Sequence, residues 1–564
     1  MLIPSSSLGA WLIAAVATAP PLRTPATPGE PRPPVATTFE ITFPASAHAG
    51  PITGRLVLAI AKTAQPEPRL AISPRGAAIF GIDIDQLAPN RPAVIDESTL
   101  GYPAQLSALA PGDYFAQAAI SIYEHVHRSD GKSMWLPMND GNIEFFSNAA
   151  HNLYSDVVPV HVGKDGVVKI SAAHVVPAFE RPKDTEWIKQ VSFQSPMLTA
   201  FWGRPIFIHA SVLLPKGYAE HPDAHYPAVY TLGHGEAPLS FSTNPPRNAA
   251  QNAVNPATGL ESGYATYEKW NGESFPRVIC ISLQQMTPYF PDSYSVNSAN
   301  NGPYGDAVTR EMMPFLEKTF RIIPKPYARH LEGASTSGWQ TLAMQLNYPS
   351  YFGGAWVFQP DPIDFTRYQE TNIYTDTNAF VVQTGPFTST ERMFQRTTDG
   401  QGLFSVRALS RFEAVLGSHG RSQFQLEAWE AVYGPVGEDG YPKPLWDKLT
   451  GTIDHSVAEY MRDNGFDLRA HAEKSWPTIG PQLVGKLHFS AGDMDDYWLN
   501  LAVYKFQDFL QTTTNPHYEG DFVYGRPMKG HAWHYTTWAE LIQRVAADVK
   551  REAPAGENVA QWNY

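Results

Sequence analysis

Hydrophobic and polar residues follow two different patterns along the chain, and the change falls near residue 200. In the first part they alternate over 39–43, another strand-like run covers 54–60, and a longer strand is expected over 114–123. A period of two is typical of strands with one buried face. Short strands at this spacing predict an all-β, immunoglobulin-like antiparallel sandwich over residues 38–178.

After Arg204, strand patterns alternate with helical ones. Residues 278–283 form an apolar strand, 307–320 have helical periodicity, and 538–550 are expected to form the last helix. Strands that alternate with helices are typical of a mostly parallel sheet. The pattern therefore predicts an α/β domain over roughly residues 200–555.

Composition agrees with this division. A chain of 564 residues exceeds the usual size of one compact domain, so two domains are expected. The net charge of −13 argues against nucleic acid or an anionic membrane surface as partner. The single cysteine, Cys280, lies in an apolar run and is expected to be buried. Because there is only one cysteine, an internal disulfide and a thiolate metal cluster are excluded.

The first 37 residues differ from the rest. An apolar stretch over 8–16 is followed by small residues over 17–19, which resembles a signal peptide with its cleavage site. The stretch is too short to span a bilayer, and the proline-rich residues 20–34 are typical of an extended linker. We expect a secreted or periplasmic protein, with a cytoplasmic one as the alternative.

The segment around Ser335 has the features of a nucleophile elbow, a sharp turn from a strand to a helix that exposes a serine. Small residues surround this serine, with Gly333 two positions before it and Ser337 and Gly338 after it. Apolar residues then recur at helical spacing until Tyr348-Pro349 stops the helix. A Ser/Gly-rich loop before an ordinary helix is the alternative.

Two later motifs stand in the order serine, acid, histidine. A short strand ends at Gly492 and is followed by the acidic residues 493–496, and Gly530-His531 precedes the last helix. A serine hydroxyl becomes nucleophilic when an imidazole takes its proton, and a carboxylate must hold that imidazole in one tautomer. His534 competes with His531 for the role of base, and the Gly-His-x-Trp context favours His531.

The oxyanion of such a reaction needs two preset N–H donors. One is expected from Thr336, directly after the serine. The other is expected from Gly235 or Glu236, in a Gly-His-Gly turn after an apolar strand.

Other polar clusters are given simpler interpretations. Asp361 and Asp364 follow the strand after the elbow and are interpreted as a turn, with a pocket-lining role as the alternative. The aspartates at 493–496 lack the Gly and Glu of an EF-hand loop. His125 and His127 lack a third ligand at metal-site spacing. We expect no metal and no cofactor.

As an ensemble these motifs resemble the putative-esterase (esterase D-like) family of α/β-hydrolases, over roughly residues 200–550. The matching segments are 214–218, 226–235, 333–339, 348–354, 492–497 and 530–533. By this resemblance Ser335 is the nucleophile, His531 the base and Asp495 the acid, which fits a G-x-x-D-x-aromatic pattern. The resemblance also implies that residues 385–480, between the elbow and the acid, form a helical cap, with a structural insertion as the alternative. The chain departs from the family at Ser337, which replaces a glycine, and in the polar strand 327–332.

These observations predict a serine esterase that cleaves carboxylic esters through an acyl-enzyme. Its substrate would be a small-molecule or carbohydrate-linked ester, and the aromatic content of 12% favours a bulky group. The alternatives are an acyltransferase, or an inert hydrolase fold that binds carbohydrate or protein. The oligomeric state is not predicted.

Overall fold

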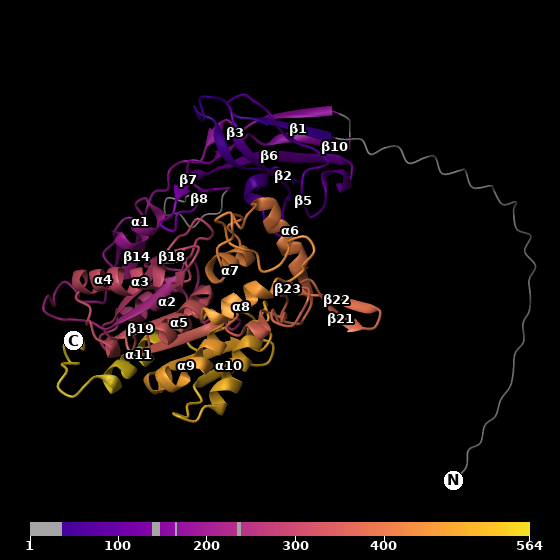
Figure 1. The fold of residues 1–564 in the computed structure, drawn as a ribbon. Helices are drawn as coiled ribbons and strands as arrows, with labels where there is room; N and C mark the ends of the chain where they lie inside the picture. The colour runs from indigo at the N-terminus through magenta and orange to yellow at the C-terminus, as the bar shows by residue number, and fades with distance from the viewer. Residues whose placement is uncertain (1–36, 138–146, 164–165, 234–237) are drawn as a thin grey trace, which may run out of the picture.

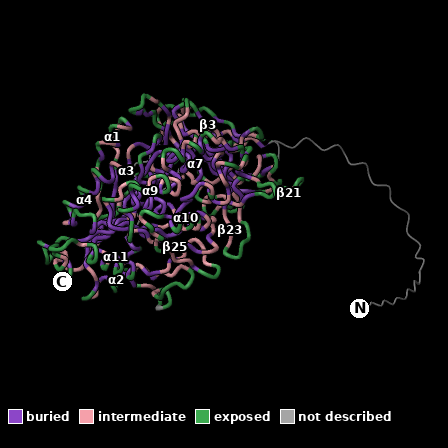
Figure 2. The backbone as a smooth tube through the Cα atoms, turned by 60° about the horizontal axis from the view of Figure 1, so that its bottom comes forward, coloured by how far each residue is buried: buried purple, intermediate pink, exposed green. Residues whose placement is uncertain are grey.

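The computed structural model describes residues 37–137, 147–163, 166–233 and 238–564 (Figure 1). The N-terminal strands gather at one end of the molecule, and helices α6 (Val406–Leu416) and α7 (Gln425–Tyr433) lie between them and the α/β layers. Buried residues run through the middle of the molecule, and exposed ones follow its periphery (Figure 2).

The N-terminal strands form two sheets and one hairpin. Three strands pair in the order β11-β1-β4, and seven form a second sheet in which β12-β9-β6-β2-β3-β5 are neighbours and β10 pairs with β6. The sheet strands are β1 (Thr37–Thr42), β2 (Ile52–Ala61), β3 (Ala78–Leu87), β4 (Ala93–Ile95), β5 (Gly101–Tyr102), β6 (Gly112–Ile122), β9 (Leu153–Tyr154), β10 (Val158–Val162), β11 (Gly166–Ser171) and β12 (His174–Val175); the hairpin is β7 (Glu124–His127) with β8 (Ser133–Leu136).

Strand β2 shows why this sheet is apolar on both sides. Its residues Leu56 and Leu58 belong to the core between the two sheets. Val57 and Ala59 point the other way and join the core of the rest of the chain. The run is therefore continuously apolar instead of alternating, because both faces of the sheet are covered. Pairing is antiparallel except between β1 and β11, which run parallel, and such a pair needs the long connection that separates them.

The second region is built on one sheet of eight strands in the order β13-β14-β16-β15-β19-β20-β25-β26. Strands β13 and β14 are antiparallel to their neighbours, and the remaining pairs are parallel. The strands are β13 (Ile188–Gln194), β14 (Phe207–Leu213), β15 (Ala228–Gly233), β16 (Ile279–Gln284), β19 (Arg329–Ser335), β20 (Gly354–Pro360), β25 (Leu487–Gly492) and β26 (Asp521–Gly525). A mostly parallel sheet with interspersed helices was predicted, and this α/β-hydrolase-like arrangement agrees with it.

Helices connect these strands. They are α1 (Pro196–Trp202), α2 (Gly263–Trp270), α3 (Tyr304–Ala307), α4 (Met313–Thr319), α5 (Thr336–Asn347), α8 (His455–Asp463), α9 (Leu468–Leu483), α10 (Asn500–Thr512) and α11 (Trp538–Glu552). The helix expected over 307–320 is an α3–α4 run joined by a π-helical turn over Val308–Met312. No helix in the described ranges is long and apolar enough to cross a bilayer.

The long segment between β20 and β25 holds α6 to α9 and two hairpins, β21 (Val381–Gly385) with β22 (Thr388–Glu391) and β23 (Met393–Arg396) with β24 (Gly402–Ser405). Helix α6 is fixed to the N-terminal strands. The buried guanidinium of Arg55 donates to the carbonyls of Ala414 (3.1 Å) and Val415 (2.7 Å) at the end of that helix. The ring of Tyr102 packs edge-on against Phe412, with centroids 5.3 Å apart.

The polar strand before the elbow is β19, and each of its buried polar side chains has a partner. Arg329 forms an ion pair with Glu317, His330 bonds the carbonyl of Tyr327 at 3.0 Å, and Glu332 accepts a hydrogen bond from Thr231. Burial raises the pKa of Glu332 to about 7. The polar sequence of β19 is therefore compatible with a central strand, because buried polar groups are tolerated when they are hydrogen-bonded.

Candidate functional site

Ser335 sits at the turn between β19 and α5, with φ 58° and ψ −122°. A non-glycine residue in this region is strained, and such strain is typical of functional positions. The flanking glycines are required by close approach. A Cβ on Gly333 would lie 2.5 Å from the backbone of Ser337, and one on Gly338 would lie 2.7 Å from the carbonyl oxygen of Phe358.

Ser337, the departure from the family pattern, is accommodated by a second glycine. A Cβ on Gly233, at the end of β15, would lie 2.2 Å from the Ser337 hydroxyl oxygen. The Ser337 side chain therefore occupies the space that Gly233 leaves free. It is buried and is absent from the lining of the cavity described below.

The acid and the histidine are brought together. Asp495 follows β25, its side chain is fully buried, and its Oδ2 lies 2.8 Å from Nδ1 of His531. Its Oδ1 accepts the backbone N–H groups of Tyr497 (2.9 Å) and Leu499 (3.1 Å). The carboxylate is thus held rigidly while one oxygen faces the imidazole.

The two neighbouring aspartates have other partners. Asp493 accepts the backbone N–H of Lys529 at 3.1 Å, and Asp496 accepts that of His531 at 3.4 Å. Both connect the acidic loop to the loop that carries the histidine. Of the three, Asp495 alone has a hydrogen bond to the imidazole among the described contacts.

The electrostatic surroundings distinguish His531 from His534. Burial lowers the pKa of His531, but the carboxylates of Asp495, Asp361 and Asp496 outweigh it and raise that pKa above its ordinary value of 6.5. Burial lowers the pKa of His534 to about 4. The His534 ring donates from Nδ1 to the carbonyl of Ala532 at 3.1 Å, and this residue does not line the cavity beside Ser335.

Ser335 and His531 line one cavity of about 430 Å³. Five Phe, Trp and Tyr side chains line it, and four of them come from the segment between β20 and β25. The lining residues are Ser73, Pro74, Arg75, Ser335, Asp361, Gln369, Phe394, Gln395, Phe404, Phe424, Gln425, Trp429, Tyr497, Leu499 and His531. Ser73 to Arg75 come from the N-terminal region, so segments far apart in the sequence enclose the space.

Asp361 has a larger part in this cavity than the sequence suggested. It was interpreted as a turn residue, but the Ser335 hydroxyl donates to its Oδ1 at 3.3 Å. Its Oδ2 accepts from Tyr294 (2.7 Å) and Trp429 (3.1 Å), and Thr336 and Gln425 also donate to it. Burial raises the pKa of Asp361 despite these donors.

The sequence could have indicated a role for Asp361 in the site through its position directly after β20. The carboxyl edge of parallel strands is where active-site groups gather. Within the described residues, no hydrogen bond joins Ser335 to His531, so the hydroxyl is turned toward Asp361. Catalytic hydrogen bonds are often loose before substrate binds.

Thr336 is the first residue of α5, and the N–H groups of a first helical turn have no intrahelical acceptor. Its backbone is therefore available to a ligand at Ser335. The other expected oxyanion donors, Gly235 and Glu236, lie outside the described residues. No group of three or more His, Cys, Asp and Glu side chains in the described ranges is placed to hold a metal ion.

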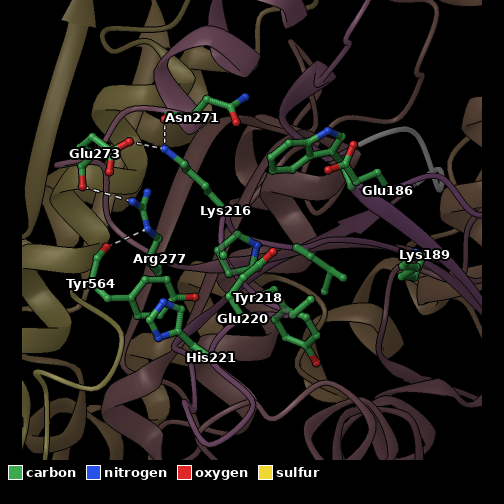
Figure 3. Close-up of a pocket in the computed structure, with 15 residues that line it drawn as sticks. Glu186, Lys189, Lys216, Tyr218, Glu220, His221, Asn271, Glu273, Arg277 and Tyr564 are labelled. Atoms are coloured by element: carbon green, nitrogen blue, oxygen red, sulfur yellow. Dashed lines mark hydrogen bonds and ion pairs between the residues drawn. The ribbon is translucent and has the colours of Figure 1, made fainter.

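A larger cavity of about 690 Å³ lies elsewhere, around Lys216, Arg277 and Tyr564 (Figure 3). Its cations are already bound to protein oxygens. Arg277 donates to the carbonyls of Gly272 (3.0 Å) and Tyr564 (3.2 Å), and Lys216 is paired with Glu273. None of the expected catalytic residues lines it.

Comparison with known proteins gives a family match. Residues 206–425 match the family described as Putative esterase, and no curated protein matches the chain. Solved structures similar to this chain include a ferulic acid esterase (14% identity, 64% of this chain and 97% of that chain covered, TM-score 0.34). Others are an S-formylglutathione hydrolase from Staphylococcus aureus (15%, 64% and 98%, TM-score 0.32) and one from Agrobacterium tumefaciens (11%, 66% and 99%, TM-score 0.30).

Proposed function

We propose that this carboxylic ester hydrolase, whose residues 206–425 match the Putative esterase family, cleaves its substrate through an acyl-enzyme on Ser335. One observation carries the proposal. The strained Ser335 lines the same cavity as His531, and the ring of His531 is bound to the buried carboxylate of Asp495. A nucleophile, a base and an orienting acid in this relation are the parts that acyl transfer requires.

The reaction begins with a change in hydrogen bonding at Ser335. Its hydroxyl leaves Asp361 and donates to the free ring nitrogen of His531. Because Asp495 holds the other ring nitrogen, the imidazole presents its unprotonated nitrogen to the serine. The raised pKa of His531 makes it a stronger base than an ordinary histidine.

The reaction then proceeds in two steps, acylation of Ser335 and hydrolysis of the acyl-enzyme. Ser335 Oγ bonds to the ester carbonyl carbon while His531 takes the proton, and the oxyanion accepts the N–H of Thr336 and one from Gly235 or Glu236. Collapse breaks the bond to the alcohol oxygen, which leaves with the proton from His531. Water repeats the sequence on the acyl-enzyme, releasing the carboxylic acid and restoring the serine.

An ester panel with mass detection tests this proposal. Purified protein should hydrolyse p-nitrophenyl esters, and quenching during turnover should reveal a mass increase equal to the acyl group on the peptide that contains Ser335. Ser335→Ala should abolish the adduct and lower kcat by about 10⁶-fold, the scale seen for serine-protease nucleophiles. Hydrolysis that persists in Ser335→Ala, with acyl groups on another residue, would overturn the assignment.

The proposed domain arrangement follows the same logic. We propose an immunoglobulin-like sandwich over 38–178, a hydrolase domain over 200–555, and a cap over 385–480 that shapes the cavity. The aromatic residues Phe394, Phe404, Phe424 and Trp429 on the cavity wall support the cap. We also propose export directed by residues 1–37, which N-terminal sequencing of the protein from culture medium or periplasm would test.

A further inference from the structure

Arg75 is the only lysine or arginine among the described residues that line the cavity beside Ser335. It comes from the N-terminal region, on the loop between a 3₁₀ turn (Pro68–Ala71) and β3. Arg75 is exposed, and within the described part of the chain its guanidinium has no ion pair and no hydrogen bond. A cation with these properties, at a cavity whose floor carries the buried Asp361, is available to a ligand.

The loop that carries Arg75 is held in place. Tyr102 donates to the carbonyl of Pro74 at 2.5 Å, and the N–H of Gly76 donates to the carbonyl of Ser73 at 3.0 Å. A Cβ on Gly76 would lie 1.9 Å from the carbonyl oxygen of Ala71, so the turn leaves no room for a side chain there. Tyr102 also packs on Phe412 of α6, which connects the loop to the segment that forms the cavity wall.

Arg75 lines the same cavity as Tyr497 and His531. Burial raises the pKa of Tyr497, and Arg75 is a positive group that opposes this rise. The Tyr497 ring in turn packs edge-on against His531, with centroids 4.9 Å apart. The positive charge of Arg75 is therefore felt by the ring that packs against the imidazole.

We propose that Arg75 selects esters that carry a negatively charged group, so that the N-terminal region supplies part of the substrate site. The inference rests on the proposed esterase function. The aromatic wall would cover the apolar body of such a substrate, and the guanidinium would pair with its carboxylate or another anion. Because the chain carries a net charge of −13, attraction of an anion to this cavity depends on a local cation.

Two matched ester pairs test this selection. p-Nitrophenyl hexanoate and mono-p-nitrophenyl adipate differ by a charge on the acyl half. Phenyl acetate and 4-carboxyphenyl acetate differ by a charge on the alcohol half. For each pair, the ratio of kcat/KM for the charged ester to that for the neutral one is compared between wild type and variants, so the esters' intrinsic reactivities cancel.

Arg75→Met should lower this ratio roughly tenfold for one of the pairs, since a hydrogen-bonded charge pair is worth about that much. Arg75→Lys should retain part of it, because the ammonium keeps the positive charge but loses the planar fork of the guanidinium. Arg91→Met is the matched control, because Arg91 is an exposed arginine of the same region that lines no cavity described above. Ratios that change less than about twofold in both pairs would overturn the proposal.

A binding arm separates this inference from the esterase proposal. Calorimetric titration compares adipic acid monoamide with hexanamide, and 4-hydroxybenzoate with phenol, and needs no turnover. Tighter binding of an anion that Arg75→Met removes would support the anion site even in a protein that cleaves no ester. Cleaved esters together with charge-independent ratios and binding would leave the esterase standing and refute the role of Arg75.

Discussion

Two cavities of this protein lie at opposite edges of the same sheet, and the proposed catalytic residues line the smaller of the two. The cavity of about 430 Å³ contains groups that follow the carboxyl ends of β19 and β20, and His531 after β26. The cavity of about 690 Å³ is lined by residues that precede β15 and β16, at their amino ends. Parallel sheets place ligands at the carboxyl edge.

The charged groups of the two cavities also differ in whether they already have partners within the protein. At the amino edge, Arg277 and Lys216 are bound to carbonyls and to Glu273, so they stabilise the local fold (Figure 3). At the carboxyl edge, Ser335 is strained, His531 has a raised pKa, and Arg75 has no described partner. The candidate active site is therefore distinguished by polar groups that are strained or have no partner, and not by its volume.

The largest effect on activity is expected from a substitution of the proposed acid, Asp495. Asp495→Asn should lower turnover by about 10⁴-fold, as loss of the orienting carboxylate does in serine proteases, while circular dichroism stays unchanged. Asp496→Asn is the matched control, because Asp496 bonds the backbone of His531 and not its ring, and it should cost far less. If Asp496→Asn loses most of its activity and Asp495→Asn loses little, the acid is Asp496 and the assignment of Asp495 is wrong.

Asp361 should give an intermediate effect. Asp361→Asn removes the acceptor of the Ser335 hydroxyl and of several donors from the cavity wall, so kcat/KM should fall roughly ten- to hundredfold.

The pH profile gives a second readout for Asp361. In the proposed mechanism, activity requires neutral His531 and is lost as pH falls through the pKa of that residue. Because the Asp361 carboxylate raises that pKa, the variant's acid limb should move to lower pH. An acid limb that stays in place, together with lower activity, would indicate a purely structural role.

The smallest effect is expected at the amino edge. Lys216→Met removes a cation from the larger cavity and should change kcat/KM by less than about twofold, because exposed ion pairs contribute little. Its melting temperature controls for folding. A large loss of activity in a folded Lys216→Met protein would contradict the assignment of function to the smaller cavity.

Periodicity predicted the main elements well because their patterns are local. Helix α11 begins at Trp538 as expected, with a capping box between Thr537 and Glu540, and Cys280 is buried in β16. The parallel pairing of β1 with β11 was not foreseen, because pairing depends on contacts far apart in sequence.

The candidate site was predictable only in part for the same reason. Ser335, Asp495 and His531 stand in motifs with recognisable neighbours, and the structure brings Asp495 and His531 together. Asp361 looked like a turn because its donors, Tyr294 and Trp429, are distant in sequence. Arg75 lies in another region of the chain, and no local pattern connects it to the cavity.

Labelling with a fluorophosphonate probe, followed by peptide mapping, tests the central claim most directly, because the probe reacts with a serine activated by a neighbouring base. The account predicts one modified peptide, with the label on Ser335. Labelling should disappear in Ser335→Ala, weaken strongly in His531→Ala, and persist in Lys216→Met. Folded wild-type protein that remains unlabelled, or that carries the label on another serine, would contradict it.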